Sequence, residues 1–166
     1  MVAAREMALR YLKHFSDIRK TRRNSIALLG QPGAGKTHLL MAISNILMQK
    51  GIAVQYFPWV EGMNDLKSDW DELERKVHRM QTVDVLYLDD LFKGRERPTP
   101  FQLEQLYAVV NYRYLNHLPI LVSAERDFEV LMSNEYGDEA LGSRLYEMCR
   151  DYTTVLSGRH LNHRLI

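Results

Sequence analysis

The sequence predicts an α/β fold in which helices cover both faces of a parallel β-sheet. Three observations predict it: a glycine-rich loop joins a strand-like to a helix-like segment, apolar strand-like segments alternate with helical ones, and polar residues follow the strands. Continuous apolar strands are typical of parallel sheets that are buried on both faces. Ligands bind such sheets at the carboxyl ends of the strands, so we expect the functional site there.

The composition is that of an ordinary globular protein. A length of 166 residues predicts a single domain over residues 1–166, in which residues 1–23 form an N-terminal helix and a basic linker. The net charge of +1 excludes a polycation, so nucleic-acid binding requires a local basic patch. The single cysteine, Cys149, excludes an internal disulfide and fits a cytoplasmic location. No apolar run is long enough to span a membrane, and we expect no membrane partner.

The glycine-rich loop at residues 30–37 matches the phosphate-binding pattern G-x-x-x-x-G-K-[ST]. An apolar strand at residues 25–29 precedes it, and residues 38–49 carry apolar side chains at helical spacing. Glycines allow the backbone N–H groups to approach a triphosphate, and a helix N-terminus favours anions. The expected nucleotide-binding residues are Gly30, Gln31, Pro32, Gly33, Ala34, Gly35, Lys36, Thr37 and His38.

The pattern indicates that ATP and Mg²⁺ are the ligands, and we expect two side chains of this loop to contact them. Lys36 supplies a point charge to the β- and γ-phosphates. The Thr37 hydroxyl is the expected Mg²⁺ ligand.

Ahead of the loop, residues at helical spacing from Ala4 to Phe15 predict a first amphipathic helix. A basic stretch follows, formed by Arg19, Lys20, Arg22 and Arg23. Such stretches are either solvated linkers or contacts for nucleic acid and partners, and the sequence leaves both interpretations open.

After the loop, strands and helices alternate along the chain. Apolar runs bounded by turn residues predict strands at residues 52–57, 83–88, 119–123 and 153–156. Helical spacing predicts helices at residues 66–80, 103–114 and 137–150, and Asp127 caps a short helix through Leu131. The helix over 66–80 has one apolar stripe, which is more typical of core packing than of a partner groove: Leu66, Trp70, Leu73, Val77 and Met80. A polar loop spans residues 93–100.

Two strands after the phosphate loop end in polar side chains that suit phosphate chemistry. Asp89 is expected to hold Mg²⁺, directly or through water. Asp90 is expected to orient and deprotonate the attacking water, with capping of a turn as the alternative. Ser123 either hydrogen-bonds the γ-phosphate or the water, or caps the strand end.

Arg144, within Gly-Ser-Arg-Leu far along the chain, is a candidate arginine finger for a neighbouring subunit. Its guanidinium would neutralise charge on the transferring phosphoryl group. Taken alone, such an arginine is more typical of a surface salt bridge.

These motifs resemble an AAA+ ATPase of the bacterial helicase-loader group, the DnaC and DnaI type, with the transposition helper IstB close by. The resemblance rests on residues 33–39, the Asp-Asp pair within 86–91 and residues 142–145. It implies a P-loop NTPase three-layer sandwich with a five-stranded parallel sheet, strand order 5-1-4-3-2, and no full helical lid.

The resemblance also implies roles for individual residues. Asp89 and Asp90 take the positions of the Walker B acids. Ser123 falls in the sensor 1 region, where the family has Ser-Asn and this chain has Ala124. Arg144 matches the first of two family arginines, and Arg164 matches a sensor 2 arginine. The helix over 66–80 falls where loaders carry an extra DNA-contacting element.

The function implied is an ATPase, weak or stimulated by DNA or a partner, that loads the replicative ring helicase onto single-stranded DNA. The resemblance also implies a head-to-tail oligomer. Without a loader's helicase-gripping N-terminal domain, the chain is expected to be an excised ATPase module or a naturally short form. The alternatives are an IstB-type transposition helper on duplex DNA, and a nucleotide-dependent partner-binding switch with little hydrolysis.

Overall fold

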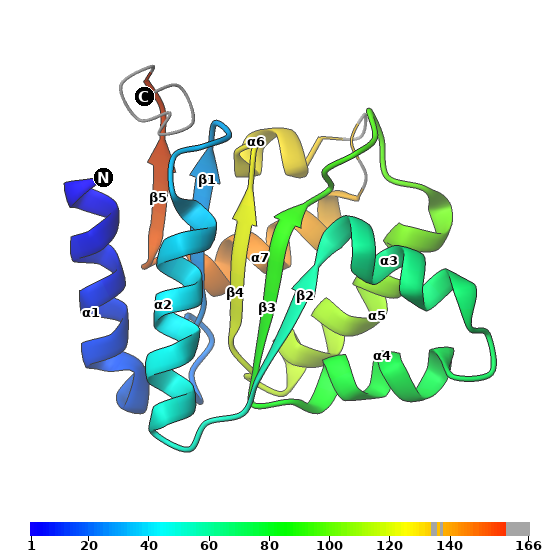
Figure 1. The fold of residues 1–166 in the computed structure, drawn as a ribbon, viewed down its shortest axis with the longest axis horizontal. Coiled ribbons are helices and arrows are strands. Elements are labelled where there is room, and N and C mark those ends of the chain that lie inside the picture. The colour runs from blue at the N-terminus through cyan, green and yellow to red at the C-terminus, as the bar shows by residue number, and fades with distance from the viewer. Residues whose placement is uncertain (134–135, 137, 159–166) are drawn as a thin grey trace.

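Five parallel strands form one sheet in the computed structural model, which describes residues 1–133, 136 and 138–158. The strands are β1 (Ile26–Gly30), β2 (Val54–Pro58), β3 (Val85–Leu91), β4 (Ile120–Ala124) and β5 (Thr153–Leu156). Their order is β2-β3-β4-β1-β5 (Figure 1), which confirms the predicted order read from the opposite edge. Because every paired strand is parallel, all carboxyl ends meet at one edge of the sheet.

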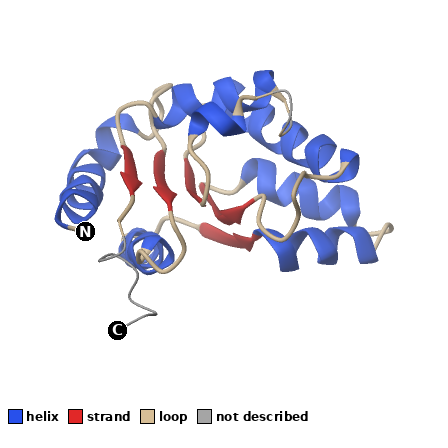
Figure 2. Cartoon of the chain, turned by 90° about the horizontal axis from the view of Figure 1, so that it is seen from above, coloured by secondary structure: helices blue, strands red, loops and turns tan. Residues whose placement is uncertain are grey.

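Helices cover both faces of this sheet, as the three-layer prediction requires (Figure 2). The helices are α1 (Val2–Ile18), α2 (Lys36–Gln49), α3 (Trp59–Ser68), α4 (Leu73–Thr82), α5 (Pro100–Leu115), α6 (Phe128–Leu131) and α7 (Glu139–Cys149). Side chains alternate between the faces along each strand. Leu28 and Tyr87 join the core beneath α1 and α2, whereas Leu29 and Leu88 join the core shared with α3, α4, α5 and α7. No helix in the described ranges is long and apolar enough to cross a membrane.

The single helix predicted over residues 66–80 is wrong, because two helices occupy this region. α3 ends at Ser68, and Asp69 leaves the helical conformation with φ −136° and ψ 84°. The Glu72 N–H donates to Asp69 Oδ1 at 3.3 Å, so this side chain competes for a backbone group that a continuous helix would use. Trp70 is 65% exposed, whereas the stripe predicted a buried residue. Its ring packs in a T-shaped arrangement with that of Phe101, with the centroids 5.5 Å apart.

The helix after β3 begins earlier than its apolar spacing predicts. The structure starts α5 at Pro100 and not at residue 103. Thr99 Oγ1 accepts from the Gln102 N–H at 3.2 Å, and the Thr99 N–H donates to Gln102 Oε1 at 3.0 Å. This capping box satisfies the first turn, and a proline is well suited to the position that follows it.

A buried arginine organises the sheet edge opposite the strand carboxyl ends. Arg113 has no exposed surface, and its guanidinium donates to the carbonyls of Met80, Gln81, Val83, Asp84 and Pro119. These contacts join the end of α4 and the starts of β3 and β4. Burial lowers the pKa of Arg113 to about 9, so the side chain still carries its proton at neutral pH.

Candidate active site

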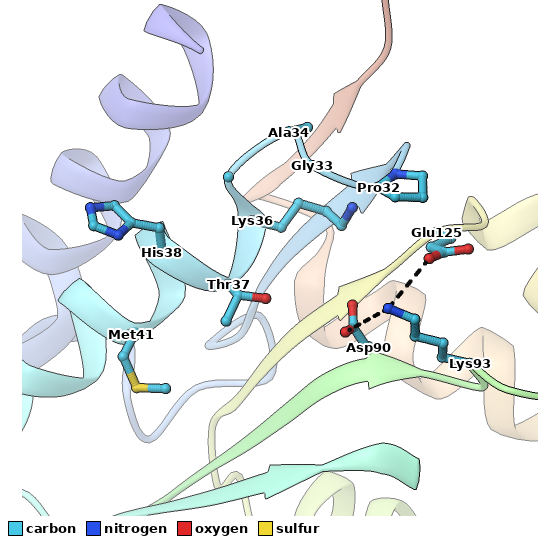
Figure 3. Close-up of a pocket in the computed structure, with 11 residues that line it drawn as sticks. Pro32, Gly33, Ala34, Lys36, Thr37, His38, Met41, Asp90, Lys93 and Glu125 are labelled. Carbon is cyan, nitrogen blue, oxygen red and sulfur yellow. Dashed lines mark hydrogen bonds and ion pairs between the residues drawn. The ribbon is translucent and has the colours of Figure 1, made fainter. Parts of the chain in front are cut away.

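A cavity of about 470 Å³ opens at the carboxyl edge of the sheet (Figure 3). Its volume is in the range of ligand-binding pockets. The phosphate loop and the start of α2 form one wall, and the turn after β3 forms the other. The described residues that line it are Pro32, Gly33, Ala34, Gly35, Lys36, Thr37, His38, Met41, Asp90, Lys93 and Glu125. The fold thus brings together most of the predicted nucleotide-binding residues with Asp90.

The backbone of the phosphate loop has a positive φ at three glycines, Gly30, Gly33 and Gly35. Gly30 has φ +124°, and a Cβ there would lie 1.9 Å from the carbonyl oxygen of Leu156 on the adjacent strand β5. Gly35 has φ +85° at the residue that precedes α2. The Gln31 side chain exchanges two hydrogen bonds with the Gly158 backbone, at 2.5 and 2.9 Å. The loop is therefore anchored to the segment that follows β5.

Lys36 is nearly buried, with its ammonium group inside the loop. Its Nζ donates to the carbonyl oxygens of Gly30 at 2.6 Å and Gln31 at 2.7 Å. Burial lowers the pKa of Lys36, while the charges of Asp90 and Glu125 oppose that shift. The loop carbonyls thus hold a cation beside the cavity in which phosphate is expected.

Asp89 is a buried carboxylate that accepts hydrogen bonds from four hydroxyl groups. Tyr87 OH and Ser123 Oγ donate to Oδ1 at 2.8 and 2.7 Å, and Tyr56 OH donates to Oδ2 at 2.9 Å. Thr37 Oγ1 lies 3.0 Å from Oδ1 and 3.3 Å from Oδ2. Hydrogen bonds to the ionised form offset the cost of burying a carboxylate. Its position is therefore fixed by α2, β2, β3 and β4 together.

The pair formed by Thr37 and Asp89 fits a magnesium ion bound with a nucleotide. Both offer oxygen donors, and Mg²⁺ prefers a few protein oxygens together with water and substrate phosphates. Among the described residues, no group of three or more histidine, cysteine, aspartate or glutamate side chains could hold a metal alone. The fit is therefore to a phosphate-dependent Mg²⁺ site and not to a closed protein cage.

Ser123 lies behind the two acids and has no exposed surface. Its hydroxyl donates to Asp89 Oδ1 and accepts from the Asp90 N–H at 2.8 Å. Both hydrogen bonds join the hydroxyl to the two acids, and its predicted contact with the γ-phosphate or a water stays a prediction. Ser123 thus couples the positions of the two aspartates.

Asp90 directs its carboxylate into the cavity (Figure 3). The pairing of β3 with β4 is irregular between Leu88 and Leu91, and Asp90 adopts φ +53° there. A bulge of this kind re-aims a side chain at a strand end. The carboxylate contacts the ammonium of Lys93 at 3.4 Å, while the Lys93 N–H bonds to the Asp90 backbone carbonyl. This placement favours the water-orienting role over capping.

Arg144 lies on α7, away from the cavity of its own chain. Its guanidinium stacks over the rings of Tyr107 and Tyr114 at 5.5 and 5.6 Å, and Nη1 donates to the Ala140 carbonyl. None of the ion pairs in the described part of the chain involves Arg144. The salt-bridge alternative is therefore not what the structure shows. The predicted sensor 2 residue, Arg164, lies outside the described residues.

The basic stretch before β1 is largely paired with acids. Arg19 lies 3.9 Å from Asp84, Arg22 lies 4.0 Å from Glu147, and Arg23 lies 3.4 Å from Asp151. Arg22 also stacks on the ring of Tyr114 at 3.6 Å. Lys20 is exposed, and no ion pair is found for it among the described residues. Because it leads into β1, the stretch lies at the sheet edge away from the cavity. The three acids therefore offset much of the positive charge that the stretch presents to a partner.

Sequence reasoning missed Tyr56, Tyr87, Lys93 and Glu125. Tyr87 precedes Asp89 by two residues, so strand periodicity could have placed both side chains on one face. Tyr56 pairs in register with Tyr87, which only the sheet arrangement reveals. Lys93 belongs to the polar loop predicted over residues 93–100. Its approach to the cavity depends on the positive φ values of Asp90 and Phe92, which have no sequence signal without glycine.

Replacing Tyr87 by phenylalanine should reduce the free energy of unfolding by about 1–2 kcal/mol, because a hydrogen bond to the buried Asp89 carboxylate is lost. Denaturant titration measures the change. In an Asp89→Ala background the same substitution should cost less. An equal cost in both backgrounds would show that the tyrosine stabilises the protein by packing alone.

Comparison with sequence families shows a match of residues 3–157 to the model for IstB-like ATP binding protein. YqaM of Bacillus subtilis is 52% identical over 98% of this chain and 53% of its own length. XkdC of the phage-like element PBSX from the same organism is 54% identical over 96% of this chain and 61% of its own length. An ATP-binding protein of insertion sequence IS21 from Pseudomonas aeruginosa is 27% identical over 87% of this chain and 54% of its own length. The chain thus spans between half and two thirds of these relatives.

Solved structures share the fold. The crystal structure of DnaI has a TM-score of 0.77 at 22% identity, over 94% of this chain and 84% of that one. The crystal structure of the DnaC helicase loader has a TM-score of 0.72 at 26% identity, over 90% of this chain and 87% of that one. The chain therefore shares its overall α/β fold with DnaI and with the DnaC helicase loader.

Proposed function

Because this chain belongs to the IstB-like ATP-binding protein family, we propose that it hydrolyses ATP and uses the cycle to load a replicative ring helicase onto single-stranded DNA. The observation that carries the ATPase proposal is the convergence of Lys36, Thr37 and Asp90 on one cavity, with Asp89 directly beneath Thr37. A cation, two oxygens that can ligate a metal and a carboxylate that faces the cavity are the groups that phosphoryl transfer to water requires.

The phosphate loop binds and orients the triphosphate in this proposal. Its N–H groups and the N-terminus of α2 surround the phosphates, and Lys36 exchanges the loop carbonyls for phosphate oxygens. Bound Mg²⁺ would neutralise charge between the β- and γ-phosphates. Thr37 and Asp89 would hold that ion, since their oxygens already lie together.

Asp90 acts on the attacking water. The Asp90 carboxylate faces the cavity, and the Asp90 N–H donates to Ser123 Oγ. This hydrogen bond fixes the backbone of Asp90 and therefore the direction of its side chain. The carboxylate orients the water and accepts its proton as the water oxygen attacks the γ-phosphorus and the bond to ADP breaks. Arg144 of a neighbouring chain stabilises the charge that develops on the phosphoryl group.

The loader role is supported by the fold shared with the DnaC helicase loader over 90% of this chain. Its partners in this proposal are the ring helicase, single-stranded DNA and further copies of the chain, arranged head to tail. A heterologous contact of that kind generates a ring or a helical assembly.

A transposition helper acting on duplex DNA is the second candidate. The family itself and the relative from insertion sequence IS21 favour it. A partner-binding switch with little hydrolysis is the third. The observation in its favour is Ala124, which places a buried methyl group where the resemblance predicts an amide.

Replacing Lys36 by alanine should weaken ATP binding at least tenfold, about 1.4 kcal/mol, because the phosphates lose a positioned charge. Replacing Asp90 by asparagine should leave ATP affinity within about twofold and reduce turnover by about 10²–10⁴, since a water-orienting base acts in the transition state. Nucleotide titration and phosphate release measure the two quantities. Equal ATP affinity for Lys36→Ala and the unchanged protein contradicts the site, and full turnover in Asp90→Asn contradicts the base.

Single-stranded DNA should bind more tightly than duplex DNA of equal length when ATP is present, if the loader role is right. The logarithm of the affinity should fall linearly with the logarithm of salt concentration, because phosphate contacts release counterions. A pull-down with a replicative helicase and ATP complements the titration. Preference for duplex DNA without helicase capture would favour the transposition helper. If the simultaneous replacement of Arg19, Lys20, Arg22 and Arg23 by serine leaves both the affinity and the salt slope unchanged, the basic stretch is a solvated linker.

Replacing Arg144 by alanine should keep ATP binding and lower turnover by about 10³-fold, the scale of an arginine finger. Mixing Arg144→Ala chains with Asp90→Asn chains should restore part of the activity, because some junctions then pair an intact Asp90 with an intact Arg144. Phosphate release at several protein concentrations measures both effects. If the mixture stays inactive while the unchanged protein depends on concentration, Arg144 does not act across the junction.

A further inference from the structure

A second lysine faces the phosphate loop from the opposite wall of the cavity (Figure 3). Lys93 Nζ lies 3.4 Å from Asp90 Oδ2 and 3.9 Å from Glu125 Oε1. Its side chain is 40% exposed, so the ammonium can move within the opening. Two carboxylates therefore hold a cation beside the place where the terminal phosphate of a bound nucleotide is expected.

The turn that carries Lys93 has an unfavourable backbone conformation held by packing. Asp90 and Phe92 have φ values of +53° and +65°, a region that side chains other than glycine rarely adopt. Phe92 is buried between Trp59 and Tyr136, with ring centroids 5.2 and 5.5 Å away. The Lys93 N–H donates to the Asp90 carbonyl at 3.0 Å. A strained backbone of this kind persists only where the packing around it holds it in place, and such strain is concentrated at functional sites.

Ser123 and Ala124, at the end of β4, offer no charged side-chain group that would compete with Lys93 for a bound phosphate. Ser123 is fully engaged beneath Asp89 and Asp90, and Ala124 is buried and apolar. Among the described residues that line the cavity, the other basic side chains, Lys36 and His38, both come from the wall formed by the loop and α2. Lys93 is thus the cation available to the far side of a bound triphosphate.

We propose that Lys93 is a catalytic residue that binds the γ-phosphate of ATP in its own chain. The proposal rests on the proposed ATPase function and deepens it. The γ-phosphate carries more negative charge than either carboxylate, so the ammonium transfers from Asp90 to phosphate oxygens when ATP binds. The same movement leaves the Asp90 carboxylate free to accept the proton of the attacking water. ADP offers no γ-phosphate, so Lys93 stays with Asp90 and Glu125, and the contact distinguishes ATP from ADP.

The test compares Lys93→Met with Lys93→Arg and with Arg95→Met, an exposed cation two residues along that does not line this cavity. Nucleotide titrations give the ratio of ATP to ADP affinity, phosphate release gives turnover, and thermal unfolding shows that each variant is folded. Lys93→Met should weaken ATP binding and leave ADP binding unchanged, so that the ratio of ATP to ADP affinity falls at least fivefold. The same substitution should lower turnover at least tenfold. Lys93→Arg should retain part of both properties, and Arg95→Met should retain all of both.

An unchanged affinity ratio in folded Lys93→Met would overturn the proposal, and so would increased turnover, which would mean that the lysine only restrains Asp90. These outcomes are separable from failure of the proposed function. The unchanged protein decides whether ATP is bound and hydrolysed. The affinity ratio, measured with a non-hydrolysable ATP analogue, still tests the Lys93 contact if hydrolysis is absent.

Discussion

The rest of the site depends on the buried carboxylate of Asp89. An ionised side chain with 4% exposure is tolerated only when its lone pairs are satisfied, and four hydroxyls satisfy them here. Thr37 brings α2 and the phosphate loop to this point, Tyr56 brings β2, and Ser123 brings β4. One carboxylate thereby fixes the distance between the nucleotide loop and the strands whose ends face it.

Every charged group around the cavity has a partner from the protein itself. Lys36 is held by loop carbonyls, Asp89 by hydroxyls, and Asp90 by Lys93. Under our proposals a bound nucleotide takes the place of the loop carbonyls at Lys36 and of Asp90 at Lys93, so binding exchanges internal contacts for phosphate contacts. Such exchange links occupancy of the cavity to the turn after β3, because Asp90 and Lys93 share that turn.

The amino ends and the carboxyl ends of the strands differ in function. At the amino ends of the strands, Arg113 donates to five carbonyls and joins segments that are distant in the chain. Removing such a buried cation would leave carbonyls unsatisfied, at about 1–3 kcal/mol for each affected group. At the carboxyl ends, the charged side chains of Lys36, Asp90 and Lys93 line a cavity. The hydrogen bonds of Arg113, which stabilise the fold, and the residues of the candidate active site therefore lie at opposite ends of the same strands.

The sequence by itself determined the features whose signals are local. The phosphate loop with Lys36 and Thr37, the apolar strands and the acids at the carboxyl end of β3 follow from spacing and residue type. Resemblance added the strand order. Only the tertiary structure decided which groups meet: Tyr56 with Asp89, Lys93 with Asp90, and Arg22 with Glu147. It also decided the break at Asp69, where the apolar stripe continues across a non-helical residue. The physical reason is that hydrogen bonds, ion pairs and strained turns depend on distances between segments, which a one-dimensional pattern does not contain.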